Sequence, residues 1–408
     1  MLKFFNFLVL AAICATNCLS SQTQDSILLG PGYTNTVYYS FSGEKSSSPA
    51  AAWDIAFEIP GFSSSILING GKGVQLWNVT GSDGESFDKT IDTTQLFKQA
   101  TLNNSATSWS SGAFNMGIDY NTGDFGWGEY NMVTHQVTGK TVYVVKLAGK
   151  FVKKIIIDAL SGGVYSFRYS NIDGSDLQTK TIAKKDFPNK NFMYFSLENG
   201  IAIDREPAQW DLSFGKYVAF VPTPYIVTGA LTNRGIKTAV YYGSSPKTAS
   251  LSGLPLEENI SAIGYNWKTY TGSSYAMSDS LAYFIQTSDS SIKRLIFTGF
   301  GGPQTGSISF EFTPVATSSV VENGNAHSIL ALYPNPAHGT ATVLYSTQKV
   351  GSEITLAVWD VLGNKLQTTT QIATDNLMQY PVTGLPSGTY IVTMTIAGQT
   401  VSQKLIVE

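Results

Sequence analysis

The sequence predicts an all-β fold, built as two tandem antiparallel β-domains and a small C-terminal β-sandwich. Three observations predict it: short runs of β-branched and aromatic residues between turn residues, 38 glycines spread along 408 residues, and an internal repeat. Windows with the 3.6-residue period of an amphipathic helix are scarce. At about 150 residues a domain, the length also favours two or three domains.

Composition narrows the functional classes. Charged residues make up 13% of the chain, apolar residues 43% and aromatic residues 12%, which excludes an intrinsically disordered chain and a charged coiled coil. The net charge is −3, and no basic cluster offers a surface for nucleic acid. After the N-terminal leader, no stretch reaches the roughly 18 uncharged apolar residues of a membrane-spanning helix. We therefore expect neither a nucleic-acid partner nor a transmembrane segment.

The first twenty residues predict a secretory signal peptide. Lys3 precedes an apolar run from Phe4 to Ala15, which is too short to cross a bilayer, and cleavage before Ser21 leaves small residues at the processing site. Both cysteines, Cys14 and Cys18, would leave with residues 1–20. The mature chain would then have no disulfide and no thiolate metal site. Acylation of Cys18, as in a lipoprotein, remains the alternative.

Several segments show the composition of strands. They are short, rich in Val, Ile, Tyr and Phe, and bounded by Gly, Asn, Asp or Ser. The clearest are Thr141–Val145, Lys154–Ile157, Tyr165–Tyr169 and Leu295–Phe297.

Two copies of one pattern follow each other along the chain. Trp127-Gly-Glu-Tyr130, Tyr143-Val-Val and Lys153-Lys-Ile-Ile-Ile157 recur without a gap, 140 residues later, as Trp267-Lys-Thr-Tyr270, Tyr283-Phe-Ile and Lys293-Arg-Leu-Ile-Phe297. Upstream, Tyr39-Ser-Phe-Ser-Gly43 and Trp53-Asp-Ile-Ala-Phe57 recur as Tyr194-Phe-Ser-Leu197 and Trp210-Asp-Leu-Ser-Phe214. The pattern predicts two sibling β-domains at residues 30–178 and 187–314. The repeated tryptophans are expected to be core or interface anchors, and Asp54 and Asp211 to have structural roles.

These same motifs resemble the HmuY-like haem-binding proteins of Bacteroidetes. Tyr38-Tyr-Ser-Phe41, the Trp53 and Trp127 blocks and Val164-Tyr-Ser-Phe167 carry the resemblance. It implies an all-β domain that holds haem between two axial side chains. The position of the family's second ligand falls on Met132 or on His135, with Met116 as a possible partner. Both residue types coordinate haem iron. The expected cofactor is thus haem, taken up free or from host haemoproteins.

Other interpretations of these residues stay open. His135 lies in a polar Thr-His-Gln segment, where a histidine is commonly only solvated, and Met116 and Met132 have the flexible side chains that fill gaps in cores. In the second copy the equivalent positions hold Gly272 and Tyr275. A surface adhesin or glycan-binding protein without haem is the alternative function.

Enzyme chemistry has little support in the sequence. There is no Gly-x-Ser-x-Gly elbow, no His-Glu-x-x-His motif and no Walker loop. We therefore expect no enzymatic activity, although a carbohydrate-active enzyme needs no linear motif.

The C-terminal segment, residues 328–408, predicts a separate antiparallel sandwich. Tyr333-Pro-Asn-Pro336, Ile354–Gly363, Leu385–Val392 and Lys404–Val407 are alternating strands and turns. This order resembles the type A sorting domain of the type IX secretion system, and residues 315–327 have the composition of a linker. The resemblance implies export by that machinery, removal of the domain by a sortase-like peptidase, and release or attachment to surface polysaccharide. The expected location is extracellular or at the outer-membrane surface.

Overall fold

The computed structural model describes residues 22–60, 64–81, 84–119, 122–149, 151–220, 222–315, 328–333, 335–338, 340–347, 353–372, 377–396 and 399–408. Within these ranges the regular elements are strands, apart from short 3-10 turns and two four-residue helices, α1 (Thr93–Leu96) and α2 (Gly302–Thr305). The all-β prediction is confirmed. The signal peptide predicted at residues 1–20 lies outside the described residues, as does the predicted linker beyond Val315. No helix in the described part of the chain is long and apolar enough to span a bilayer.

Two hydrophobic cores occupy the part of the chain before residue 316. One encloses Trp127 and the other encloses Trp267, and we call the surrounding strands the Trp127 module and the Trp267 module. Both belong to one compact unit, and the C-terminal strands belong to a second. Both tryptophans are almost wholly buried, which confirms their predicted role as core anchors.

The Trp127 module consists of two antiparallel sheets. The larger contains the predicted strands at 141–145, 154–157 and 165–169. Its strands are β6 (Gln75–Asn78), β7 (Gly128–Asn131), β8 (Gln136–Gly139), β9 (Val142–Lys146), β10 (Val152–Ser161), β11 (Val164–Asn171) and β12 (Gln178–Ala183). The smaller has the order β14 (Ile201–Ile203), β13 (Phe192–Ser196), β4 (Ile55–Glu58), β5 (Ile66–Ile68).

The Trp267 module repeats this arrangement. Its larger sheet has the order β1 (Thr23–Leu28), β22 (Ser307–Pro314), β21 (Ile292–Phe300), β20 (Leu281–Gln286), β17 (Lys237–Tyr242). Its smaller sheet has the order β16 (Pro224–Thr232), β15 (Leu212–Phe220), β2 (Asn35–Tyr39), β3 (Lys45–Pro49). A hairpin of β18 (Lys268–Tyr270) and β19 (Tyr275–Met277) corresponds to β7 and β8.

The repeat seen in the sequence is therefore visible strand by strand. The ladder between β10 and β11 shifts register between Ile157 and Ala159, and the ladder between β21 and β22 shifts between Phe297 and Gly299, 140 residues later. Upstream the alignment needs a one-residue correction. Tyr39 pairs with Leu212 as Phe195 pairs with Ile55, so that Tyr38, and not Tyr39, is the equivalent of Tyr194.

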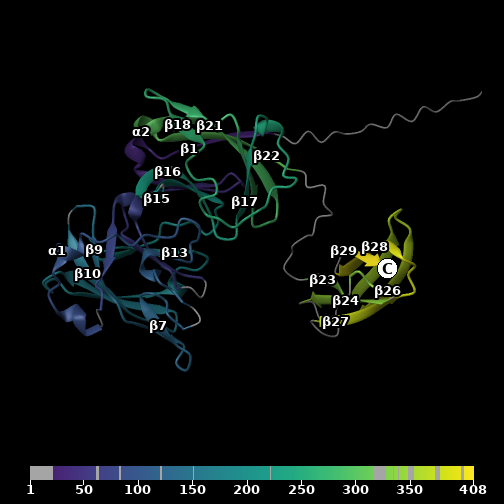
Figure 1. Ribbon diagram of the computed structural model, residues 1–408, viewed down its shortest axis with the longest axis horizontal. Coiled ribbons are helices and arrows are strands. Elements are labelled where there is room, and N and C mark those ends of the chain that lie inside the picture. The colour runs from purple at the N-terminus through teal and green to yellow at the C-terminus, as the bar shows by residue number, and fades with distance from the viewer. Residues whose placement is uncertain are drawn as a thin grey trace, which may run out of the picture. The chain divides into compact units, whose positions relative to one another are not determined.

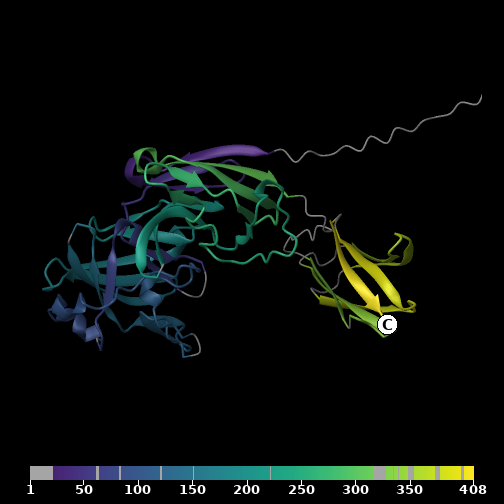
Figure 2. The ribbon, with the colours of Figure 1, turned by 45° about the horizontal axis from the view of Figure 1, so that its top comes forward.

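The two repeats exchange their first strands. β1 and β2 from the start of the chain pair with β22 and β15 of the second repeat. Reciprocally, β12 and β13 from the start of the second repeat pair with β11 and β4 of the first. In Figures 1 and 2 the purple β1 accordingly lies along the green β21 and β22, and Figure 1 places β13 among the blue strands of the Trp127 module.

The predicted ranges 30–178 and 187–314 follow the order of the repeats but leave out the first strand of each, β1 and β12, and each compact module takes strands from both repeats. The joint lies between β11 and β12, because β12 already begins the second repeat. Sequence similarity predicts the order of strands within a repeat. It does not predict whether a strand pairs within its own repeat or with the other one, because equivalent strands of the two repeats offer equivalent backbone edges for pairing.

Two buried aspartates form hydrogen bonds between the repeats where the strands are exchanged, in agreement with the structural role expected for them. Asp54 accepts a hydrogen bond from the backbone N–H of Leu197 at 2.8 Å, and Asp211 accepts one from the backbone N–H of Phe41 at 2.7 Å. Each carboxylate lies in one repeat and its backbone partner in the other. Asp54 also forms an ion pair of 2.7 Å with Lys72.

The C-terminal unit is a small antiparallel sandwich, as the sequence predicts. A three-stranded and a four-stranded sheet share a core that includes Leu332, Ile354, Val392 and Leu405. Its strands are β23 (Ser328–Tyr333), β24 (Thr340–Thr347), β25 (Glu353–Asp360), β26 (Lys365–Ile372), β27 (Leu377–Thr383), β28 (Gly388–Ile396) and β29 (Gln399–Val407).

Candidate functional site

The residues predicted to coordinate haem lie at one end of the Trp127 module. Met132 and His135 bound the turn between β7 and β8, and both side chains are exposed, that of Met132 by 82%. The backbone N–H of His135 donates to the carbonyl of Asn131, and Nδ1 of His135 lies 2.7 Å from the hydroxyl of Tyr130. The two candidate ligands therefore share one tight hairpin turn at the surface.

Met116 follows the 3-10 turn Ala113–Asn115 and is 54% exposed, so it does not fill a gap in the core. Neither hollow described below is lined by Met116, Met132 or His135. Coordination of haem by these residues remains a prediction. Among the described residues, no group of three His, Cys, Asp or Glu side chains gathers where it could hold a metal ion.

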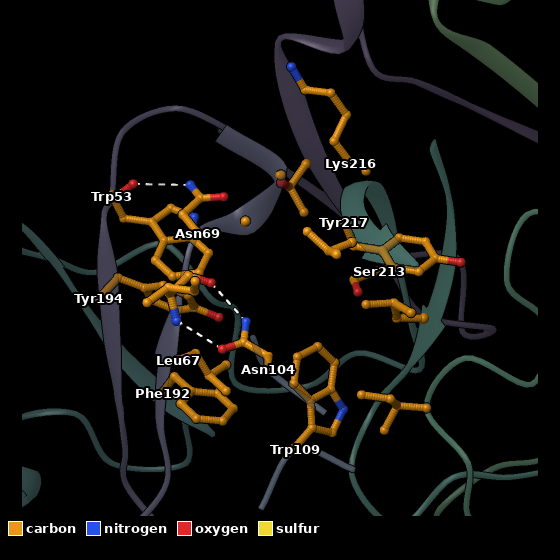
Figure 3. A pocket seen from close by; sticks show the side chains of 18 of the residues that line it. Trp53, Leu67, Asn69, Asn104, Trp109, Phe192, Tyr194, Ser213, Lys216 and Tyr217 are labelled. Atoms are coloured by element: carbon orange, nitrogen blue, oxygen red, sulfur yellow. Dashed lines mark hydrogen bonds between the residues drawn. The ribbon is translucent and has the colours of Figure 1, made fainter. Parts of the chain in front are cut away.

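A pocket lies elsewhere, at the junction of the two modules. It has a volume of about 130 Å³ and lies between the two smaller sheets, β14-β13-β4-β5 and β16-β15-β2-β3 (Figure 3). The alternation of side chains along a strand builds its walls. In β13, Met193 and Phe195 enter the Trp127 core while Phe192 and Tyr194 line the pocket. In β2, Val37 and Tyr39 enter the Trp267 core while Tyr38 lines the pocket.

Two pairs of aromatic rings, related by the repeat, form the centre of this lining. Trp53 contacts Tyr194 edge to face with centroids 5.0 Å apart, and Tyr38 contacts Trp210 in the same way at 5.2 Å. The hydroxyls of Tyr38 and Tyr194 lie 3.4 Å apart. Both tryptophans were expected to be anchors, and the structure places them at the interface between modules.

A loop from the first repeat supplies the polar part of the lining. Asn104 Oδ1 accepts from the N–H of Ile68 at 3.0 Å, and its Nδ2 donates to the carbonyl of Ile68 at 2.8 Å, so this side chain acts like an added strand at the edge of β5. Trp109 Nε1 donates to the carbonyl of Thr232 in the other module at 2.9 Å. Figure 3 shows Asn104 and Trp109 side by side on the wall of the pocket.

On another side of the pocket, the backbone at Gly71 packs directly against the backbone of β15. Gly71 lies against β15 so closely that a Cβ at this position would stand 2.2 Å from the carbonyl oxygen of Lys216. Only glycine permits this contact, because any other side chain would force the two elements apart.

A buried acid holds several wall residues in place. Glu206, which is 2% exposed, accepts hydrogen bonds from Trp210 Nε1 at 2.9 Å and from the hydroxyl of Tyr194 at 3.2 Å. It also accepts from Asn191 and from the N–H of Phe192. Burial raises the pKa of the Glu206 carboxyl, and these donors oppose the shift. Glu206 therefore orients the rings of the wall from behind.

Arg205 is a buried charged residue of the wall. Its guanidinium carbon lies 5.1 Å from the ring centroid of Tyr194, 5.7 Å from that of Trp53 and 6.0 Å from that of Tyr38. Such stacking on ring faces is favourable for a desolvated cation.

A second hollow of about 320 Å³ adjoins the first. It is lined by Thr107, Ser108, Trp109, Ser110, Arg234, Glu258 and Ile260, and it shares Ser108, Trp109 and Ile260 with the pocket. Arg234 is fixed there by an ion pair of 2.6 Å with the buried Glu58 of the other module.

Sequence reasoning missed this pocket, although one signal was available. Phe192–Ser196 is a short apolar run without alternation, which is typical of a strand that is buried on both faces. A second covered face implies a partner sheet, and the residues on that face are those of the pocket. Trp109 and Arg205 lie in irregular segments outside the repeated motifs, so the repeat gave no indication of them.

One family matches part of the chain. Residues 331–408 match the family described as the secretion system C-terminal sorting domain. The C-terminal domain predicted at 328–408 is thereby identified, and it shows that the protein is secreted or lies at the outer-membrane surface and engages the secretion machinery. No curated protein matches the chain.

Two solved structures align weakly. One is dimeric latent PorU from Porphyromonas gingivalis, with 10% identity over 67% of this chain, 26% of that chain and a TM-score of 0.17. The other is Escherichia coli alpha-2-macroglobulin activated by porcine elastase, with 9% identity over 95% of this chain, 43% of that chain and a TM-score of 0.16. The chain thus spans about a quarter and less than half of their respective lengths. At these TM-scores the likeness supports no inference.

Proposed function

We propose that this exported protein binds glycans and that the pocket between the two modules is its binding site. The observation that carries the proposal is the combination of Trp53, Trp109 and Trp210 with amide and hydroxyl side chains in one small cavity. Aromatic rings offer flat apolar surface to the C–H faces of a sugar, and Asn and Ser side chains offer both donors and acceptors to its hydroxyls.

The size of the pocket agrees with a single sugar ring. A cavity of roughly 150 Å³ holds one benzene molecule, whereas drug-sized ligands need about 300–1,000 Å³. At about 130 Å³ the pocket holds little more than a bare six-membered ring, so the substituents of a pyranose would extend into the adjoining hollow of about 320 Å³, and the pocket is too small to enclose a porphyrin. The adjoining hollow beside Trp109 offers space for a neighbouring unit of an oligosaccharide.

In this proposal the protein binds the glycan and does not hydrolyse it. Glycosidases usually place two carboxyl groups on either side of the scissile bond. The described lining of the pocket contains no Asp or Glu, and that of the adjoining hollow contains one carboxylate, Glu258, and not a pair. Glu206 lies behind the rings and its carboxylate already accepts several hydrogen bonds.

A glycan array incubated with the mature chain tests the proposal, and intrinsic tryptophan fluorescence then measures the affinity for the glycans retained. We expect Trp109→Ala to weaken binding about tenfold or more, because it removes ring surface from the wall, and Trp109→Phe to retain much of the affinity. Trp77→Ala, compared once thermal unfolding shows that it is folded, is the control, since Trp77 is a buried tryptophan of the same module that does not line the pocket. An array without any bound glycan, or equal losses in Trp77→Ala and Trp109→Ala, would contradict the proposal.

Haem binding is the second proposal, favoured by the position of Met132 and His135 in one exposed turn. Titration of the mature chain with haemin distinguishes the two functions. Haem binding at the hairpin predicts a Soret band that changes in Met132→Ala or His135→Ala but not in Trp109→Ala. Met116→Ala tests the second axial position in the same way. An unchanged spectrum in all three variants would exclude Met116, Met132 and His135 as ligands of haem iron.

A further inference from the structure

Arg205 lacks the partners that a buried arginine normally has. It is 7% exposed, and its Nε and Nη2 atoms have no hydrogen-bond partner in the described part of the chain. The residue lies between β14 and β15, and its own carbonyl accepts a hydrogen bond from the hydroxyl of Ser48 at 3.0 Å. The structure therefore holds a cation in the pocket wall, against three ring faces, with unused donors.

The neighbouring acid forms no direct ion pair with this charge. The carboxylate of Glu206 is directed to Asn191, Phe192, Tyr194 and Trp210, and it forms no ion pair with Arg205 within 4.0 Å among the described residues. Burying an uncompensated charge is costly, so an arginine in such a place normally has an anion beside it.

The rest of the lining has the same sign. Lys216 is the other charged residue of the described lining, and Figure 3 shows its side chain extending from the rim. Both charged residues of the described lining are thus basic, in a chain whose net charge is −3. Composition alone gives no indication of such a site.

We propose that the ligand of this pocket is an acidic sugar, whose carboxylate binds Arg205 while its ring packs on the tryptophans. This inference rests on the proposed glycan-binding function and names its ligand class. A planar guanidinium presents paired donors that match a carboxylate, and hydrogen bonds to a charged group are stronger than neutral ones. A uronic acid unites the two features that the wall offers, a ring and a carboxylate on that ring.

Matched sugar pairs test the inference. The mature chain is titrated with glucuronic acid and glucose, and with galacturonic acid and galactose, with tryptophan fluorescence as the readout; each pair differs in one carboxylate that replaces a CH₂OH group. We expect the acidic member to bind about tenfold more tightly or better, and its affinity to fall with rising salt. Arg205→Gln should remove this preference and leave the weaker affinity for the neutral sugar nearly unchanged.

Arg294→Gln is the matched control, because Arg294 is a partly buried arginine of β21 that does not line the pocket. Thermal unfolding shows whether each variant is folded, and Arg205→Lys keeps the charge but loses the planar pair of donors. Equal binding of acidic and neutral sugars would overturn the inference while leaving the glycan proposal intact. Loss of both sugars in a folded Arg205→Gln variant would also overturn it, since Arg205 would then act only on the shape of the wall. If no sugar of either kind binds, the glycan proposal itself fails.

Discussion

Tyr39→Ala should destabilise the Trp267 module more than the Trp127 module, although Tyr39 belongs to the first repeat. Tyr39 is fully buried in the Trp267 core, and its ring meets that of Phe310 edge to face at 5.1 Å and 88°. Its hydroxyl donates to Asp25 at 3.1 Å. Truncation of a buried aromatic residue costs about 3–5 kcal/mol. This is a large part of the roughly 5–15 kcal/mol that stabilises a typical domain.

The repeat provides the mirror-image variant. Phe195, the equivalent of Tyr39, is buried in the Trp127 core, and its ring meets that of Phe167 at the same 5.1 Å and 88°. Phe195→Ala should therefore destabilise the Trp127 module, although Phe195 belongs to the second repeat.

Amide hydrogen exchange followed by mass spectrometry measures both effects. In Tyr39→Ala we expect exchange from the open state to rise by roughly two to four powers of ten in β15 and β20–β22, with a smaller change in β9–β11. Phe195→Ala should give the reverse pattern. If Tyr39→Ala instead released β9–β11 and spared β20–β22, the strand exchange between repeats would be refuted.

Three further outcomes follow from the described contacts. Asp54→Ala should lower the free energy of unfolding by about 3–5 kcal/mol, because it leaves Lys72 and the Leu197 N–H without their carboxylate. Asp54→Asn should lower it less. An unchanged urea midpoint in Asp54→Ala would contradict this prediction. Burial lowers the pKa of the Lys268 ammonium to about 8. Between about pH 8 and 9.5 the unfolded chain therefore binds more protons than the folded one, and stability should rise with pH. Lys268→Met should reduce this rise in urea titrations, and an unchanged rise would contradict the assignment. A chain that lacks residues 328–408 should stay inside the outer membrane, which cell fractionation would show; normal release of that chain would contradict the role of the sorting domain.

The fold was largely accessible from the sequence, because it depends on local patterns. Tyr143 and Tyr283 lie in short segments of strand composition, and both were placed in strands correctly. The 140-residue repeat predicted equivalent strands, and the structure shows equivalent ladders down to the register shift after Ile157 and Phe297. The sorting domain was recognisable because its turns and strands keep a characteristic order over residues 331–408.

The candidate site, in contrast, could not be predicted from local sequence patterns. Trp109 and Arg205 are about a hundred residues apart and lie in no repeated motif, and they line one pocket only because the two smaller sheets pack face to face. The residues that a family resemblance suggested, Met132 and His135, occupy an exposed turn instead.

The sequence by itself determined the strands, their duplication and the route of export, since periodicity, turn residues and terminal motifs act over short distances along the chain. Tertiary structure alone decided which repeat completes which sheet, because the edges of two sibling copies are chemically alike and only packing chooses between them. It also decided the character of the pocket. The Arg205 guanidinium is buried there against three aromatic rings, and Glu206 holds one of those rings from behind; these residues come together from both repeats only in the folded chain.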